Sequence, residues 1–189
     1  MLCFTTGCYS NGNSQNFASS TSPPKSEPLN LTAIRNLIAQ DIPTTDQIAE
    51  LTKTWDAVSC FSLALFREVL SYGDENAVIS PLSAYYVLAM VALGAREDTL
   101  YQFQSVLGSN PQELAPELTL LAQYLMYTEG NTLLNLAGSI WIDDIYTINP
   151  DFNQAMIRYF HSPAVSRNLS EQATVNEINE WICPNRWDY

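Results

Sequence analysis

Residues 76–95, NAVISPLSAYYVLAMVALGA, constrain the fold more than any other part of this chain. Between positions 82 and 93 the polar groups are the hydroxyls of Ser83, Tyr85 and Tyr86, so apolar side chains cover every side of the predicted helix. A helix that is apolar all round must be buried, either in a protein core or in a membrane. Because this run is well short of the roughly 20 residues that a bilayer requires, we expect other parts of the protein to cover it.

The start and the end of this helix are well specified. Ser80 offers a hydroxyl that can cap the first turn, and Pro81 stands at the first helical position, where its missing N–H costs nothing. Gly94 follows the last apolar residue and favours termination. Residues 77–79, just before the serine, predict a short buried strand.

Amphipathic helices are predicted on both sides of this segment. Apolar residues recur at three- and four-residue steps in each of them, which gives each helix one apolar face. The predicted helices cover residues 55–71, residues 100–107 up to Gly108, residues 111–125, a segment beginning at Asn149-Pro150-Asp151, and a last segment from Ser170 to Pro184 with Val175, Ile178 and Ile182 inward.

Residues 132–143 change to a period of two and predict a long, half-buried strand. Leu134, Leu136 and Ile140 lie on one face, and a second strand of two residues is expected at 164–165. A long strand needs neighbours for its backbone groups, and this chain supplies few of them. We therefore expect these side chains, together with Met90, to meet water, and the chain by itself to be prone to aggregation.

The charge balance excludes several classes of partner. The chain has 189 residues, with 8 Lys+Arg against 20 Asp+Glu and a formal net charge of −12. Binding to a phosphate backbone or an anionic membrane surface requires clustered cations. We therefore expect no nucleic-acid partner. No transmembrane segment is expected either, because the longest apolar run is well short of roughly 20 residues.

Cysteine and histidine are too sparse and too scattered for a metal site. Cys3, Cys8, Cys60 and Cys183 form no CxxC pair, and His161 has no adjacent cysteine or acidic cluster. We expect no metal, no cofactor and no catalytic residues, and hence no enzyme. Cys60 is predicted to be a small buried side chain, with a disulfide as the alternative.

Four regions are predicted along the chain. Residues 1–30 are rich in Ser, Asn, Thr and Pro and are expected to be a disordered tether. The context of Cys8 resembles the end of a lipoprotein signal; the other interpretation is a tail whose true signal lies upstream of Met1. Residues 31–54 are expected to be a linker with one short helix at 32–39, residues 55–182 the folded domain, and residues 183–189 a tail.

Three motifs resemble those of one family at the same spacing. NAVISPLSAYYVLAMVALGAREDTLYQFQSVLG, then LNLAGSIWID, then VNEINEWI are similar to segments of serpins. The resemblance implies an α+β fold: the N-terminal portion of the serpin fold, with helices A–F, one long strand of the main sheet and short strands. After Ile182 the sequence CPNRWDY departs from the family pattern, so the C-terminal half is expected to be absent.

The resemblance also implies a site. Asn76, Ser80, Pro81 and Ser83 would lie in the shutter, the region of serpins that controls opening of the main sheet. The serine hydroxyls would then cap the helix and hydrogen-bond beneath moving strands. The alternative is that Ser80 is an ordinary N-cap and Ser83 a tolerated first-turn serine.

Serpins inhibit serine, and sometimes cysteine, proteases with a reactive loop that is cut and then inserts as a strand into the main sheet. No part of this chain resembles that loop, so we expect the chain by itself not to inhibit. The alternative is a helical protein-binding module derived from a serpin. No heparin binding is expected, because residues 111–127 contain no Lys or Arg. The expected location is extracellular or at the cell surface, with a lipid anchor at Cys8 if the signal reading holds.

Overall fold

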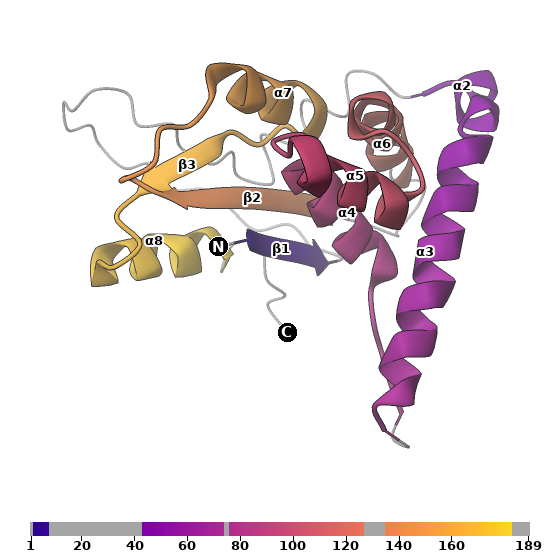
Figure 1. The fold of residues 1–189 in the computed structure, drawn as a ribbon, viewed down its shortest axis with the longest axis horizontal. Helices are drawn as coiled ribbons and strands as arrows, with labels where there is room; N and C mark the ends of the chain where they lie inside the picture. The colour runs from indigo at the N-terminus through magenta and orange to yellow at the C-terminus, as the bar shows by residue number, and fades with distance from the viewer. Residues whose placement is uncertain (1, 8–42, 74–75, 127–134, 183–189) are drawn as a thin grey trace, which may run out of the picture.

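The computed structural model describes residues 2–7, 43–73, 76–126 and 135–182 (Figure 1). It confirms an α+β arrangement, with α2 to α6 at one end of a small sheet, and α7 and α8 beside β3. In chain order the elements are β1 (Leu2–Gly7), α2 (Thr45–Glu50), α3 (Thr52–Ser71), α4 (Pro81–Ala92), α5 (Glu97–Leu107), α6 (Pro111–Met126), β2 (Asn135–Asp143), α7 (Pro150–Phe160), β3 (Ala164–Arg167) and α8 (Gln172–Ile182).

The apolar helix α4 lies in the interior, as its sequence requires. It contacts α3, α5, α6 and β1, and Met90 and Ala92 are completely buried. Figure 1 shows α4, α5 and α6 between the long helix α3 at one end of the molecule and the sheet. Leucines of α6 complete the same hydrophobic core, among them Leu114, Leu118 and Leu121.

Helix ends follow the local sequence signals. The side chain of Asn149 accepts the N–H groups of Asp151 and Phe152 at 2.8 and 3.4 Å, and Pro150 begins α7. At the end of α5, Gly108 adopts φ 68° and its N–H donates to the Gln104 carbonyl at 2.9 Å. A left-handed glycine of this kind satisfies one of the carbonyls that a helix end leaves free.

The sheet has the order β1-β2-β3 among the described residues. Strand β1 pairs antiparallel with β2, from Leu2 opposite Ile140 to Gly7 opposite Asn135. Strand β3 pairs parallel with β2, from Ala164 opposite Ile140 to Arg167 opposite Asp143. The second predicted strand is therefore confirmed at residues 164–165 and is longer than expected.

Two predictions about this sheet are wrong. Residues 2–7 were expected to belong to a disordered tether, but they pair with β2, because an extended segment satisfies the donors and acceptors of an open strand edge. Strand β2 was expected to leave Leu136 and Ile140 in water, yet these side chains and Met90 are buried. Leu134, residues 8–30 and the expected helix at 32–39 lie outside the described residues.

Strand β2 is also not half-buried. Ala137, Ser139 and Trp141, on the face opposite Leu136 and Ile140, are buried too. Period-two alternation identifies which residues share a face, but it does not determine whether a second layer covers the other face. Here both faces are covered.

The linker and the short strand were also predicted incorrectly. The folded part begins before residue 55: α2 and the start of α3 fall within residues 43–54, and Leu51 and Thr54 are buried. Residues 77–79 form no strand, because no strand lies beside them within the described part of the chain. Val78 is 98% exposed instead of buried.

Two single side chains differ from expectation. Cys60 forms no disulfide within the described part of the chain and is exposed, because it lies on the outward side of α3. On α8 the buried residues are Thr174, Ile178 and Trp181, whereas Val175 is exposed. Three- and four-residue spacing allows neighbouring stripes of one helix to face inward, and packing selects between them.

Gly108→Ala should destabilise the protein by about 1 kcal/mol, because an alanine in the left-handed region is strained whatever space surrounds it. Gly73→Ala is the matched control, since nothing lies within 4 Å of an added Cβ there and its φ is not positive. Urea unfolding followed by circular dichroism measures both. Equal stability of the two variants would contradict the assignment of Gly108 as a required left-handed cap.

Candidate functional site

The start of α4 brings together three of the four residues predicted for the shutter. The Oγ atoms of Ser80 and Ser83 lie 2.6 Å apart, and Pro81 stands between them at the first turn. Asn76 lies on the exposed segment before the helix. The structure therefore forms a local hydroxyl pair at the beginning of the apolar helix α4.

The predicted capping role of Ser80 is wrong in detail. Ser80 occupies the N-cap position, but its side chain makes no capping hydrogen bond, and its hydroxyl bonds to Ser83 instead. The first turn is closed by the backbone alone, through the Ala84 N–H to the Ser80 carbonyl at 3.3 Å. Ser80 is exposed and Ser83 is half-buried, so the role of this pair beneath a moving sheet stays a prediction.

Two tyrosines anchor α4 in the core. The hydroxyl of Tyr85 donates to the Leu107 carbonyl at 2.7 Å, and its ring meets Phe61 edge-on at 5.3 Å between ring centroids. The ring of Tyr86 meets Phe160 of α7 in the same manner at 4.9 Å. These contacts fix the helix against α3, α5 and α7, because a buried hydroxyl with one good acceptor holds a single orientation.

Burial changes the acidity of both tyrosines. Loss of hydration raises the pKa of Tyr85 to about 12, and the negative charge of Glu117 contributes to that rise. Burial also raises the pKa of Tyr86 well above its usual range. Glu117 in turn accepts a hydrogen bond from Thr54, which ties α6 to α3. Both phenols therefore stay neutral and serve as hydrogen-bonding and packing groups.

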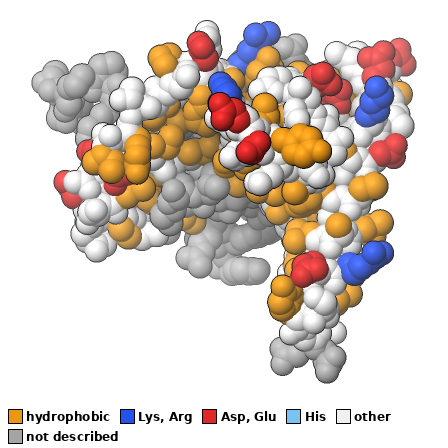
Figure 2. Space-filling view, viewed as in Figure 1, with side chains coloured by type: hydrophobic (Ala, Val, Ile, Leu, Met, Phe, Trp, Pro, Cys, Tyr) orange, Lys and Arg blue, Asp and Glu red, His pale blue; other side chains and the backbone are white. Residues whose placement is uncertain are grey.

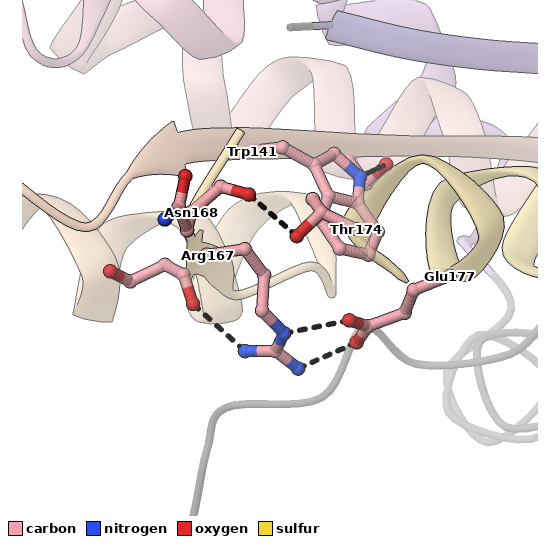
Figure 3. Close-up of polar contacts among 7 residues, drawn as sticks. Trp141, Arg167, Asn168, Thr174 and Glu177 are labelled. Atoms are coloured by element: carbon pink, nitrogen blue, oxygen red, sulfur yellow. Dashed lines mark hydrogen bonds and ion pairs between the residues drawn. The ribbon is translucent and has the colours of Figure 1, made fainter. Parts of the chain in front are cut away.

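Helix α8 is tied to β3 by a two-pronged ion pair (Figure 3). The Nε and Nη2 atoms of Arg167 donate to the two carboxylate oxygens of Glu177 at 2.8 and 2.6 Å. Its Nη1 donates to the Ser166 carbonyl at 2.9 Å, and Thr174 donates to the Asn168 carbonyl at 2.7 Å. Arg167 is only 8% exposed, so this carboxylate compensates a charge that is largely removed from water.

Strand β2, next to β3, contains a hydrogen bond between two buried side chains. The indole Nε1 of Trp141 donates to the Ser139 hydroxyl at 2.9 Å, and both side chains are buried (Figure 3). A buried indole N–H without an acceptor would be costly. Ser139 therefore explains how strand β2 accommodates a tryptophan in a covered layer.

His161 ends α7 and has the features of a structural residue. It adopts φ 51° in the left-handed region, and its N–H donates to the Met156 carbonyl. Its Nε2 atom is buried without a hydrogen-bond partner among the described residues. Burial lowers the pKa of the imidazole, because desolvation disfavours the charged ring.

Residues 2–7, 43–73, 76–126 and 135–182 contain no group of three or more His, Cys, Asp or Glu side chains that could hold a metal ion. Within the same ranges, no helix has both the length and the apolar character needed to cross a bilayer.

The Arg167–Glu177 pair was missed in the sequence. The two residues are ten positions apart and lie on different elements, so no helical or strand period connects them. The hydroxyl of Thr119, which donates to the Tyr159 carbonyl of α7 at 2.8 Å, was missed for the same reason. Only the fold brings these partners together.

Comparison with known proteins gives one consistent family. Residues 56–185 match the family model described as "Serpin (serine protease inhibitor)". Serine protease inhibitor 42Dd of Drosophila melanogaster is 33% identical over 132 residues, which cover 67% of this chain and 36% of that protein. Neuroserpin of Rattus norvegicus is 26% identical over 159 residues, which cover 82% of this chain and 36% of that protein.

Solved structures agree with the sequence matches. The structure titled "Cleaved Serpin 42Da" superposes with a TM-score of 0.59 at 27% identity, over 67% of this chain and 34% of that one. The native stressed conformation of Arabidopsis AtSerpin1 gives a TM-score of 0.58 at 23% identity, which speaks for the fold alone. The chain spans about a third of the length of the relatives that it matches.

Glu177→Gln should destabilise the protein by roughly 1–2 kcal/mol, because Arg167 then keeps one hydrogen-bond acceptor but loses the opposing charge. The effect is no larger because the side chain of Glu177 is partly hydrated. Glu180→Gln on the same helix is the control, since Glu180 is exposed and forms no ion pair with another described residue. Urea unfolding measures both variants. A Glu177→Gln protein as stable as the Glu180→Gln protein would show that the pair does not hold α8 in place.

The lowered pKa of His161 gives stability a pH dependence of known sign. The unfolded chain takes up the imidazole proton near pH 6.5, and the folded chain does so at lower pH. The unfolded state therefore binds more protons in this window, so stability is full above about pH 6.5 and falls as the pH drops through the folded pKa.

The test compares the wild type with His161→Asn, because asparagine tolerates the left-handed conformation and does not titrate. The difference in free energy of unfolding between the two proteins should change below about pH 6.5 and stay constant above it. Carboxylates titrate equally in both proteins and cancel. A difference that is constant from pH 5 to 8 would refute the assignment to His161.

Proposed function

This chain belongs to the serpin family, and from that premise we propose that it forms the N-terminal scaffold of a serpin-type serine protease inhibitor. The match to residues 56–185 is the observation that carries the proposal. That match includes the buried helix α4, the strand β2 and helix α8, which together form the framework of helices and sheet. The relative in Drosophila melanogaster is itself named as a serine protease inhibitor.

We propose further that residues 1–189 alone do not trap a protease. By the serpin resemblance, inhibition requires a reactive loop that is cut and then added to the main sheet as a strand. The matched region covers only 29–36% of the first three relatives. We assign the loop to the part of a serpin that this chain does not match, and the target protease is a serine or, less commonly in the family, a cysteine protease.

The expected location outside the cell is part of the same proposal. It follows from the family resemblance, since serpins commonly act on proteases outside cells. The lipid anchor at Cys8 stays a prediction, because residues 8–42 lie outside the described residues.

A scaffold exchange tests the proposed function. Residues 56–182 of this chain replace the matched third of Serine protease inhibitor 42Dd, and the exchanged protein is incubated with trypsin, elastase and subtilisin. We expect a complex that survives denaturing electrophoresis with at least one of them, whereas residues 1–189 alone are cleaved without forming one. Each protease with its active-site serine already blocked is the control, because a true complex is an acyl-enzyme.

Two results would contradict the proposal. One is an exchanged protein that melts cooperatively but is only cleaved by every protease that the parent inhibitor traps. The other is a stable complex formed by residues 1–189 alone with active and not with blocked protease. Cooperative melting of residues 1–189 together with the first result would favour the alternative, an independent protein-binding module.

A further inference from the structure

A cleft of about 480 Å³ lies between α2, α6 and α7. Figure 1 shows α6 between the other two helices, at the end of the molecule opposite α8, and α6 packs against both of them. Pro43 and Gln47 form one wall, four residues of α6 form the floor, and Arg158 and Tyr159 at the end of α7 form the other wall. Small-molecule sites commonly have volumes of roughly 300–1,000 Å³. We call this site the α2–α6–α7 cleft.

The floor of the cleft combines apolar and polar side chains. Its residues recur at three- and four-residue steps and so share one side of α6: Pro116, Thr119, Leu120 and Gln123. The Thr119 hydroxyl donates to the Tyr159 carbonyl at 2.8 Å, which holds the floor against α7. Pro116 and Leu120, together with Pro43 on the facing wall, therefore offer a fixed apolar surface to a ligand.

The polar side chains of the cleft donate hydrogen bonds and carry one positive charge. Arg158 is exposed and forms no ion pair with another described residue. Its guanidinium carbon lies 5.3 Å from the centre of the Tyr159 ring, and this stacking restricts the guanidinium group. The side-chain amides of Gln47 and Gln123 can donate as well. None of the eight lining residues is acidic, although the chain as a whole carries a formal net charge of −12.

We propose that the α2–α6–α7 cleft binds a small monocarboxylate that has an apolar body. The guanidinium of Arg158 donates two parallel N–H groups to the carboxylate, which is the geometry that arginine favours with this group. The apolar body lies on Leu120 and the two prolines. The site shares no residue with the start of α4, and the inference does not depend on the proposed inhibitor function.

The charges of the cleft select a single carboxylate over other anions. One arginine neutralises one negative charge, and a second charge on the ligand would find no cation among the lining residues. A sulfated polysaccharide needs several cations along its length, and the floor contributed by α6 has none. The acidic side chains elsewhere on the chain act weakly at the cleft, because salt screens charges beyond roughly 8 Å at physiological ionic strength.

The test is calorimetric titration of the full chain with 1-naphthylacetate at about 0.15 M salt. We expect one bound ligand per chain, with a Kd on the order of 0.1–1 mM for a ligand of this size. Arg158→Gln should weaken binding at least tenfold, because it removes the positive charge and keeps the length of the side chain. The neutral analogue 1-naphthylacetamide should bind the wild type at least tenfold more weakly than the carboxylate.

A matched control accompanies each variant. Arg67→Gln removes an exposed arginine of α3 that also forms no ion pair with another described residue, and it should leave the Kd unchanged. Gln123→Glu places a carboxylate inside the cleft and should weaken binding by repulsion, whereas Gln102→Glu on the exposed side of α5 should not. Far-ultraviolet circular dichroism checks that all four variants keep the wild-type helix content. If Arg158→Gln loses helix, the pair Gln123→Glu and Gln102→Glu decides.

Four results would overturn the proposal. The first is no binding of 1-naphthylacetate to the wild type, and the second is an equal loss with Arg67→Gln. The third is equally tight binding of the neutral amide, which would show that the cleft takes apolar ligands without regard to charge. The fourth is tighter binding of 1-naphthyl phosphate or of a heparin fragment, which would assign the cleft to a more highly charged anion. The titration contains no protease, so failure of the scaffold exchange would leave this inference intact.

Discussion

The rest of the structure depends on the burial of one helix that has no polar side. Full burial of a single large apolar side chain contributes about 1.5–3 kcal/mol, and α4 carries such side chains in every direction. It can be stable only where protein covers most of its surface, and α3, α5, α6 and β1 pack against it. They bury five of its residues, and none of its other residues is fully exposed. The positions of these neighbours follow from that requirement, and Tyr85 and Tyr86 fix the arrangement through one hydrogen bond and two aromatic contacts.

A different interaction holds the far end of the molecule. Helix α8 is amphipathic and has ordinary helix-forming residues, so its hydrophobic face alone does not define its position precisely. The Arg167–Glu177 pair fixes the orientation of α8 relative to β3, because two parallel hydrogen bonds to one carboxylate permit a single geometry.

The core and residues 76–80 differ in how completely their apolar groups are buried. Around α4 and β2 both faces of the secondary structure are covered, and the predicted exposure of Leu136, Ile140 and Met90 was wrong. In residues 76–80 the reverse holds, because Val78 was expected to be buried and is exposed. The same sequence pattern, a short apolar run, therefore has opposite outcomes in two places, and the deciding factor is whether another strand lies alongside.

The sequence by itself determined most of the helices, several of their ends and the family, although it missed α2. Asn149 begins one helix and Gly108 ends another through hydrogen bonds to groups within four residues of themselves. The burial of α4 follows from its own apolar sequence, so local chemistry was enough in these cases. Ser80 shows the limit even there, because its hydroxyl found a partner in Ser83 instead of the backbone. Only the tertiary structure decided that residues 2–7 pair with β2, that Arg167 meets Glu177, and that Val78 lies in water. These outcomes depend on which distant segments become neighbours, and the energy of a strand edge or a buried charge is set by the partner that arrives there.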